Sequence, residues 1–324
     1  MVLPYVTLMK SSFLFASLLA WSCLGKAWPP GFESDSPPQQ PAGPELVSVD
    51  WLKQHLTDPN QVIVQIAMER FGYDAGHIPG SVFVPMGEFH GHGDRLPAPE
   101  AIATALGRYG ITNDRRVVLI GDPMSTAILF VALDYVGHAG KTAVLDGGLG
   151  AWRAAGNATS KESVAAKPGS FVPAARNDMI VDAKWMKENL GNKRVALLDV
   201  RTRAEFDGTA KERLPRRGHI PGAKYVPWLA TFDARDLEKD ASGEPVDMAP
   251  EMVRLLPRPE LQQLFASAGA KNDGLVVTYC TVGMRASHVY FVSRLLGLPT
   301  RLYLGSMADW TKDPNNPVVG VNNQ

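Results

Sequence analysis

Cysteine is scarce in this chain of 324 residues, which contains only Cys23 and Cys280. So few thiols, one of them in an N-terminal segment that we expect to be removed, exclude an internal disulfide framework and a cysteine-rich zinc site. A charge imbalance is also missing, because lysine plus arginine and aspartate plus glutamate each total 33. The sequence therefore gives no electrostatic indication of binding to nucleic acid or to an anionic membrane.

Long apolar runs are equally rare, and the clearest one, residues 11–24, lies near the N-terminus. It is shorter than the roughly 20 apolar residues of a spanning helix. Lys10 precedes it and the small residues Gly25 and Ala27 follow it, which is the pattern of a secretory signal peptide. We therefore expect residues 1–27 to be a signal peptide and the mature protein to be periplasmic or secreted, without a membrane span. An uncleaved membrane anchor is the alternative.

The whole chain has an ordinary globular composition, with 45% hydrophobic and 20% charged residues. Residues 28–44 are rich in proline, serine and glutamine, which indicates a flexible leader. The remaining length is enough for about two domains.

An internal repeat supports two domains. The segment Gly-His-Ile-Pro-Gly occurs at residues 76–80 and again at 218–222. A strand-like run precedes each copy and a second short one follows it. These four runs are Val62–Ile66 and Ser81–Pro85 in the first repeat, and Val195–Val200 and Ala223–Pro227 in the second. A helix is expected before each copy, with Asp50 and Asp182 as N-caps.

The second halves of the repeats match as well, because residues 117–121 align with 276–280 and residues 146–152 with 304–310. Alternating strands and helices predict an α/β fold with two domains, each a mainly parallel sheet flanked by helices. The expected boundaries are 45–155 for the first domain, 156–177 for a linker, 178–316 for the second domain and 317–324 for a tail.

The chemistry concentrates where a buried strand, Leu275–Tyr279, runs into Cys280 and then into an apolar helix expected at His288–Leu296. Backbone N–H groups of such a loop, together with a helix N-terminus, form a cradle for an anion. These surroundings favour a thiolate nucleophile. The competing interpretation is that Cys280 is an inert buried cysteine, since free cysteine is often buried.

The loop from Cys280 to Arg285 reads C-x4-R and resembles the active-site loop of the rhodanese-like sulfurtransferases, whose cysteine carries sulfane sulfur as a persulfide. The resemblance covers residues 45–315 as a tandem pair of rhodanese-like domains. Cysteine-dependent phosphatases use C-x5-R, which would require arginine where this chain has Ala286. A phosphatase or arsenate reductase is therefore the less favoured alternative.

The resemblance implies a set of site residues in the second domain. Cys280 would be catalytic, and the loop around it would bind substrate. The expected substrate-binding residues are Thr281, Val282, Gly283, Met284 and Arg285, with Arg217 added from the basic run 211–217. Asp199 and His219 are expected to be structural residues near the site. No metal and no organic cofactor are expected.

The first domain lacks this chemistry. Gly121 stands where the second domain has Cys280, and Thr126 where it has Arg285. Asp122 would repel an anion as well. We therefore expect the first domain to be inactive.

The expected reaction is a transfer of sulfane sulfur through a persulfide on Cys280. The donor would be small and anionic, such as thiosulfate, mercaptopyruvate or a persulfide, and the acceptor thiophilic, such as cyanide, sulfite or a thiol, including a protein thiol. A non-enzymatic sulfur carrier or partner-binding module is the alternative. Family members that use thiosulfate and mercaptopyruvate carry an arginine where this chain has Glu205, which predicts that thiosulfate is a poor donor.

Overall fold

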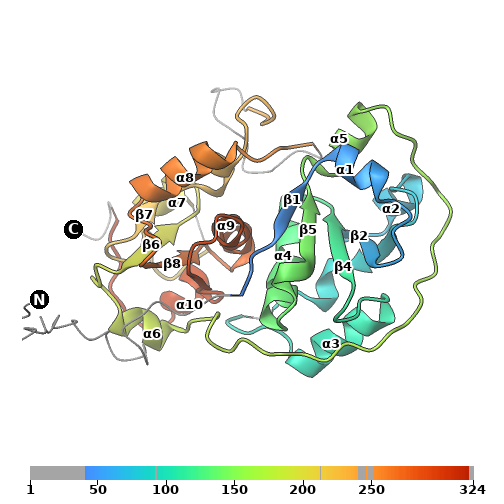
Figure 1. Ribbon diagram of the computed structural model, residues 1–324. Helices are drawn as coiled ribbons and strands as arrows, with labels where there is room; N and C mark the ends of the chain where they lie inside the picture. Colours follow the sequence, from blue (N-terminus) through green and yellow to red (C-terminus); the bar gives the residue numbers. More distant parts are fainter. Residues whose placement is uncertain (1–40, 92, 212, 240–245, 247–251, 321–324) are drawn as a thin grey trace, which may run out of the picture. The chain divides into compact units, whose positions relative to one another are not determined.

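The computed structural model describes residues 41–91, 93–211, 213–239, 246 and 252–320 (Figure 1). The expected signal peptide, residues 1–27, and most of the expected leader lie outside the described residues. In the part of the chain that is described, no helix is long and apolar enough to cross a bilayer.

The first repeat contains a sheet of five parallel strands in the order β1-β5-β4-β2-β3 (Figure 1). The strands are β1 Glu45–Val47, β2 Gln61–Ala67, β3 Val82–Pro85, β4 Arg116–Ile120 and β5 Thr142–Leu145. The helices are α1 Val49–Gln54, α2 Phe71–Ala75, η1 Met86–Glu88, α3 Pro99–Arg108, α4 Pro123–Tyr135, η2 Ala139–Lys141 and α5 Gly148–Ala154.

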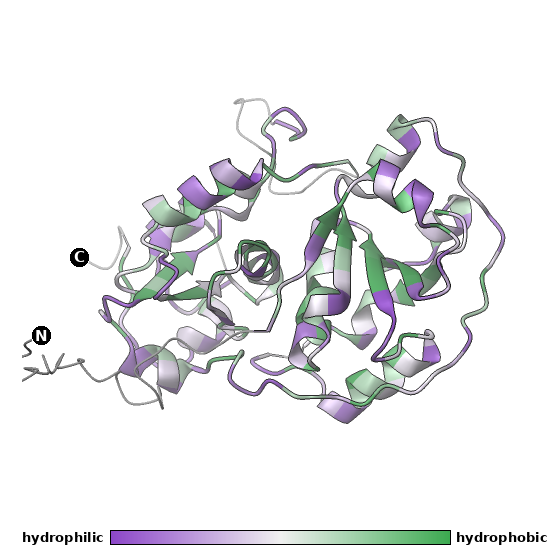
Figure 2. Ribbon diagram, in the orientation of Figure 1, coloured by the Kyte–Doolittle hydropathy of each residue, from purple (hydrophilic) through white to green (hydrophobic). Residues whose placement is uncertain are grey.

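Both faces of this sheet are covered, which explains why its strands are nearly continuous apolar runs rather than alternating ones. In β2, Val62, Val64 and Ile66 belong to one apolar cluster, whereas Ile63 belongs to a second cluster with Leu52 of α1. Successive side chains of a strand point to opposite faces, so a strand buried on both sides needs apolar residues at every position. Figure 2 shows the resulting hydrophobic strands.

The second repeat contains four parallel strands in the order β7-β6-β8-β9. The strands are β6 Val195–Asp199, β7 Lys224–Tyr225, β8 Leu275–Tyr279 and β9 Thr300–Leu302. The helices are α6 Ala183–Glu188, α7 Arg203–Asp207, η3 Trp228–Thr231, α8 Arg258–Ser267, α9 Met284–Leu295 and α10 Ser306–Trp310. The fold class is therefore confirmed: two mainly parallel sheets flanked by helices.

Helices α4 and α9 pack against each other and connect the two repeats. At their contact, the fully buried Asp134 of α4 accepts hydrogen bonds from Tyr290 at 2.8 Å and from the Arg294 guanidinium at 2.8 Å, both on α9. Arg176, from the expected linker, also pairs with Asp134. A buried carboxylate requires such partners, so this cluster joins both repeats and the segment between them.

The expected helix N-caps had different outcomes. Asp182 caps α6 by accepting a hydrogen bond from the backbone N–H of Trp185 at 2.7 Å, as predicted. The prediction for Asp50 is wrong, because Ser48 caps α1 and Asp50 lies in the first turn. Both positions suit a helix start, since a carboxylate also stabilises the first turn through the helix dipole.

Candidate active site

Cys280 directly follows β8 and is the free cysteine of the described residues, 1% exposed. Its backbone N–H donates to the Ser306 hydroxyl at 3.1 Å, and its carbonyl accepts from the N–H of Met307 at 3.1 Å. Ser306 is fully buried and has a φ of 54°, which is unusual for a residue other than glycine. The turn that carries Ser306 therefore fixes the backbone of the cysteine.

The sulfur of Cys280 receives a hydrogen bond from the backbone N–H of Gly283 at 3.1 Å. A donor directed at the sulfur is the contact that a thiolate or a persulfide anion needs. Gly283 has a φ of 92°, and a Cβ there would lie 2.7 Å from both Cδ1 and the carbonyl oxygen of Leu304. Only glycine fits this position, so the glycine in the loop is required by both its conformation and its packing.

Arg285, in the first turn of α9, forms a bidentate ion pair with Glu205 of α7, with both nitrogen–oxygen distances at 2.7 Å. The two side chains are only 14% and 12% exposed. The Thr281 hydroxyl joins them, donating to Glu205 and accepting from Arg285, both at 3.0 Å. The loop is therefore closed by a three-residue network rather than by an arginine alone.

Burial by itself would raise the pKa of the Glu205 carboxyl, but the hydrogen bonds and charge of Arg285 and the bonds from Thr202 outweigh it and lower the pKa to about 2. Thr202 and Glu205 form a capping box at the start of α7. Glu205 is thus ionised, and its charge is compensated by Arg285. The expectation that thiosulfate is a poor donor therefore depends on Glu205 cancelling the charge of Arg285, not on the charge of Glu205 alone.

The remaining loop residues take different positions. The Val282 side chain is 50% exposed, which is unusual for a valine, and Met284 is half-buried. Arg217 is exposed, and its backbone carbonyl lies against Gly208 and Gly320. A place for Arg217 in the substrate site stays a prediction.

Arg216, which also belongs to the basic run 211–217, holds a segment near the C-terminus in place. Arg216 donates to the carbonyl oxygen of Asp313 at 2.6 Å and to that of Asn316. The start of the expected tail is also held, because His219 and Val319 form an antiparallel bridge.

Asp199 ends β6 next to β8 and forms a fully buried ion pair with Arg201, at 2.7 Å between Oδ2 and Nη2. Arg201 also donates to the carbonyl oxygen of Gly218 at 2.7 Å. This pair connects the strand end to the second Gly-His-Ile-Pro-Gly segment. Sequence reasoning missed Arg201, because arginine is rarely fully buried. The carboxylate of Asp199, two residues away, was the local signal that could have indicated a buried pair.

His219 of that segment donates through Nδ1 to the carbonyl oxygen of Phe206 at 2.9 Å and stacks on the Phe206 ring, with 3.7 Å between the ring centres. His77 makes the same two contacts with Tyr73 in the first repeat, at 2.9 Å and 3.7 Å. Identical contacts in both repeats fit a structural role for His219.

The corresponding loop of the first repeat, residues 121–126, is closed. The Asp122 carboxylate accepts hydrogen bonds from the N–H groups of Met124 and Ser125, at 3.0 and 2.9 Å. The Thr126 hydroxyl is used by its own helix turn, with Asp122 and Pro123 carbonyls as partners. A Cβ on Gly121 would lie 2.3 Å from the carbonyl oxygen of Ile66. Backbone atoms therefore occupy the space of a cysteine side chain.

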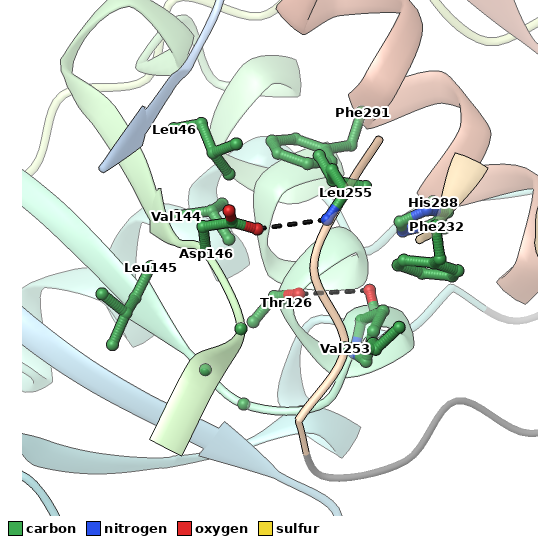
Figure 3. A pocket seen from close by; sticks show the side chains of 14 residues that line it. Leu46, Thr126, Val144, Leu145, Asp146, Phe232, Val253, Leu255, His288 and Phe291 are labelled. Atoms are coloured by element: carbon green, nitrogen blue, oxygen red, sulfur yellow. Dashed lines mark hydrogen bonds between the residues drawn. The ribbon is translucent and has the colours of Figure 1, made fainter. Parts of the chain in front are cut away.

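Beside this loop lies a cavity of only about 30 Å³, shown in Figure 3. Asp146 faces it and accepts a hydrogen bond from the N–H of Leu255 at 3.1 Å; burial raises the pKa of this carboxyl. His288 lies on the opposite side near Phe232, and burial lowers the pKa of this imidazole to about 3. The cavity has room for one or two water molecules, not for a substrate.

The first repeat nevertheless touches the reactive loop. A Cβ on Gly91 would lie 2.9 Å from Cδ2 of Leu304, whose other methyl group packs against Gly283. The segment around Gly91 therefore supports the loop of Cys280 through one shared leucine. Within the described residues, no group of histidine, cysteine, aspartate and glutamate could hold a metal ion.

Comparisons with known proteins agree with this geometry. A family model described as the rhodanese-like domain matches residues 48–155 and again residues 182–313. Thiosulfate/3-mercaptopyruvate sulfurtransferase 2 of Arabidopsis thaliana is 31% identical over 318 residues, which cover 85% of this chain and 86% of that protein. The sulfur carrier protein TtuD of Thermus thermophilus is 32% identical over 291 residues, covering 83% and 94%. The 3-mercaptopyruvate sulfurtransferase of Escherichia coli K12 is 27% identical over 294 residues, covering 85% and 98%.

Solved structures show the same fold. The anaerobic ergothioneine biosynthesis enzyme from Chlorobium limicola, in complex with trimethyl histidine, superposes with a TM-score of 0.71 at 24% identity, covering 86% of this chain and 70% of that one. The protein YnjE superposes with a TM-score of 0.72 at 23% identity, covering 85% of this chain and 68% of that one.

Proposed function

Because the chain belongs to the rhodanese-like domain family and matches it in both repeats, we propose that it is a sulfurtransferase whose second domain carries sulfane sulfur as a persulfide on Cys280. The observation that carries the assignment to Cys280 is the hydrogen bond from the Gly283 N–H to the Cys280 sulfur at 3.1 Å. The matching position of the first domain has no sulfur, so a single persulfide forms per chain.

In the first half-reaction the Cys280 thiolate attacks the outer sulfur of the donor. With thiosulfate, the sulfur–sulfur bond of the donor breaks, sulfite leaves with the electron pair, and Cys280 becomes a persulfide anion. In the second half-reaction an acceptor thiolate or cyanide attacks the outer sulfur of the persulfide and releases the Cys280 thiolate. Charge and electrons balance in both steps, so the cycle needs neither metal nor redox cofactor.

The loop residues have separate tasks in this cycle. The Gly283 N–H stabilises negative charge on the sulfur. Arg285, Glu205 and Thr281 hold the loop closed, and Ser306 fixes the backbone of Cys280. Arg285 therefore acts first as a positioning residue, because two of its guanidinium nitrogens are committed to Glu205.

Other expectations from the sequence belong to the same proposal. The signal peptide of residues 1–27 directs the protein to the periplasm or out of the cell, and the acceptor is a small thiophile or a protein thiol. A relative is named a sulfur carrier protein, so delivery to a protein partner is the second candidate function. A phosphatase role gains no support from the relatives.

Kinetics test the proposal. Wild-type protein is assayed with thiosulfate and with mercaptopyruvate as donors and cyanide as acceptor, and thiocyanate formation is measured beside Cys280→Ser. The substitution removes the nucleophile but keeps a group of similar size, so thiocyanate formation should fall by at least about a thousandfold. Turnover that survives in Cys280→Ser would overturn the proposal. Sulfur loading without turnover, followed by transfer to a protein thiol, would favour the carrier function.

A further inference from the structure

A second, much larger cavity of about 810 Å³ opens beside the second sheet. This volume lies in the range of small-molecule sites. Residues that follow β6, at 201–204, form one wall, and residues that follow β7, at 227–230, form another. The loop of Cys280 is not part of its lining, so the persulfide chemistry of that loop does not by itself account for this cavity.

Strand register places the cavity next to the reactive loop. Strands β8, β6 and β7 are neighbours, and Tyr279, Asp199 and Tyr225 are paired across them. Adjacent strands lie about 5 Å apart, so the ends of β6 and β7 are roughly 5 and 10 Å from the end of β8, where Cys280 begins. Thr202, in the cavity wall, donates to Glu205 through its N–H and its hydroxyl, at 2.9 and 2.7 Å. The wall and the loop of Cys280 therefore share the carboxylate that holds Arg285.

The lining is mostly apolar and includes two arginines. Aromatic and aliphatic side chains form most of it, and no carboxylate is among the described residues that line it. The apolar members include Tyr225, Trp228, Leu229, Phe232, Leu237 and Leu256.

The two arginines of this lining, Arg201 and Arg203, differ in how accessible they are to a ligand. The guanidinium of Arg201 is fully buried and bound to Asp199. That of Arg203 is 66% exposed, pairs with Asp207 at 2.8 Å and lies 5.3 Å from the centre of the Tyr225 ring. An exposed ion pair of this kind contributes little stability, so a ligand carboxylate can take the place of Asp207.

From these observations we propose that the cavity binds the sulfur acceptor, an organic thiol with an aromatic or branched apolar body and a carboxylate directed at Arg203. This rests on the proposed function. The acceptor thiolate attacks the outer sulfur of the Cys280 persulfide, the sulfur–sulfur bond to Cys280 breaks, and the organic persulfide anion leaves. Thiosulfate and mercaptopyruvate are small and hydrophilic, so a largely apolar cavity of this size suits the acceptor rather than those donors.

Binding is tested first, with a probe that cannot react. Calorimetric titration with 4-methylbenzoate should give saturable binding to the full chain and also to Cys280→Ser, because the probe has no thiol. Ala234→Trp, at an exposed alanine of the lining, should fill the cavity and weaken binding at least about tenfold. Arg203→Gln should weaken it about fivefold, the effect expected for one exposed ionic contact.

The first repeat supplies the matched control. Arg70 pairs with Asp74 at 3.0 Å and lies 5.0 Å from the centre of the Tyr73 ring. Its surroundings thus resemble those of Arg203, which pairs with Asp207 beside an aromatic ring, but Arg70 does not line the cavity. Arg70→Gln should therefore leave the affinity for 4-methylbenzoate unchanged. Equal weakening by Arg70→Gln and Arg203→Gln, or no saturable binding to the wild-type protein, would overturn the proposal.

Acceptor kinetics then connect the cavity to sulfur transfer. Two thiols are compared as acceptors: 4-mercaptobenzoate, which has the aromatic ring, and mercaptoacetate, which lacks it. The KM ratio of the aromatic to the aliphatic acceptor should rise at least about fivefold in Ala234→Trp. An unchanged ratio would show that the cavity does not bind the acceptor, even if Cys280 transfers sulfur. If the wild-type protein binds 4-methylbenzoate but transfers no sulfur from Cys280 to any acceptor, the proposed function would be contradicted instead.

Discussion

The aligned backbone N–H groups of the two repeats have different hydrogen-bond partners. In the first, the N–H of Met124 is bound by the carboxylate of Asp122 at 3.0 Å. In the second, the N–H of Gly283, the aligned residue, donates to the sulfur of Cys280 at 3.1 Å. One loop satisfies its donor internally, whereas the other presents the donor to a nucleophile.

This difference gives more than one reason to expect that the first domain is inactive. It lacks the cysteine, and the carbonyl oxygen of Ile66 also occupies the space that a side chain at Gly121 would need. The cavity beside that loop, about 30 Å³, is too small for thiosulfate or mercaptopyruvate. Residues of the first repeat also support the second one, because Gly91 lies against Leu304 and Asp134 binds α9.

The largest expected effect comes from an attempt to make the two loops alike. Gly121→Cys combined with Cys280→Ser should give no sulfur transfer and should destabilise the protein by about 2–4 kcal/mol, because the new Cβ would lie 2.3 Å from the Ile66 carbonyl oxygen. Urea unfolding and thiocyanate formation measure the two effects. Measurable turnover in a stable double variant would show that the first loop can open and accept a nucleophile.

The network of Arg285, Glu205 and Thr281 that closes the loop of Cys280 has no counterpart in the corresponding loop of the first repeat, residues 121–126. Removing it with Glu205→Gln should change the pH dependence of stability. The folded pKa of about 2 is below the ordinary 4.5. The ion pair therefore stabilises the protein fully above about pH 4.5, and this contribution is lost as the pH falls towards 2.

The lost contribution is about 3 kcal/mol for a shift of this size. Between pH 4.5 and 2, the free energy of unfolding of wild-type protein should thus fall by about that much more than that of Glu205→Gln. Asp207→Asn, in an exposed pair, is the control and should follow the wild type. Parallel curves for wild type and Glu205→Gln would contradict the network.

A smaller effect is expected where the first repeat supports the active loop. In Gly91→Ala the new Cβ would lie 2.5 Å from the carbonyl oxygen of Arg95 and 2.9 Å from Cδ2 of Leu304. The segment around Gly91 should therefore shift, its contact with Leu304 should change, and kcat/KM should fall about tenfold, because small displacements of a reacting group are costly. Gly87→Ala is the matched control, since a Cβ there has open space within 4 Å. Equal kinetics for the two variants would show that the contact through Leu304 is irrelevant to the reaction.

The smallest effect concerns the donor. Since Glu205 compensates the charge of Arg285, the loop offers no net cation to thiosulfate, and we expect its KM to exceed about 1 mM. Glu205→Gln leaves Arg285 charged and should lower this KM about threefold at low salt, with a smaller change for mercaptopyruvate, which carries one charge less. A KM for thiosulfate that stays constant or rises would show that the pair does not face the donor.

Much of the fold could be predicted from the sequence because local patterns determine it. The repeat, its strands and the Asp182 cap follow from apolar periodicity and from a side chain near a helix start. The pair of Glu205 and Arg285 could not be predicted, because its partners are 80 positions apart. One local signal existed, since Thr202 and Glu205 form the T-x-x-E pattern of a capping box.

The roles of the remaining missed residues depend entirely on tertiary contacts. Ser306 reaches the backbone of Cys280 across 26 positions, and the Ile66 carbonyl closes the space at Gly121 from a neighbouring strand. Sequence periodicity does not encode such distances.

The most direct test of the central claim, that one of the two loops carries sulfur, is the mass of the intact protein after treatment with a donor. We predict the added mass of one sulfur atom per chain on the wild type, its removal by cyanide, and its location on the peptide that contains Cys280. Cys280→Ser should show no added sulfur. Cyanide-labile sulfur on Cys280→Ser, or on a wild-type peptide without Cys280, would contradict the account.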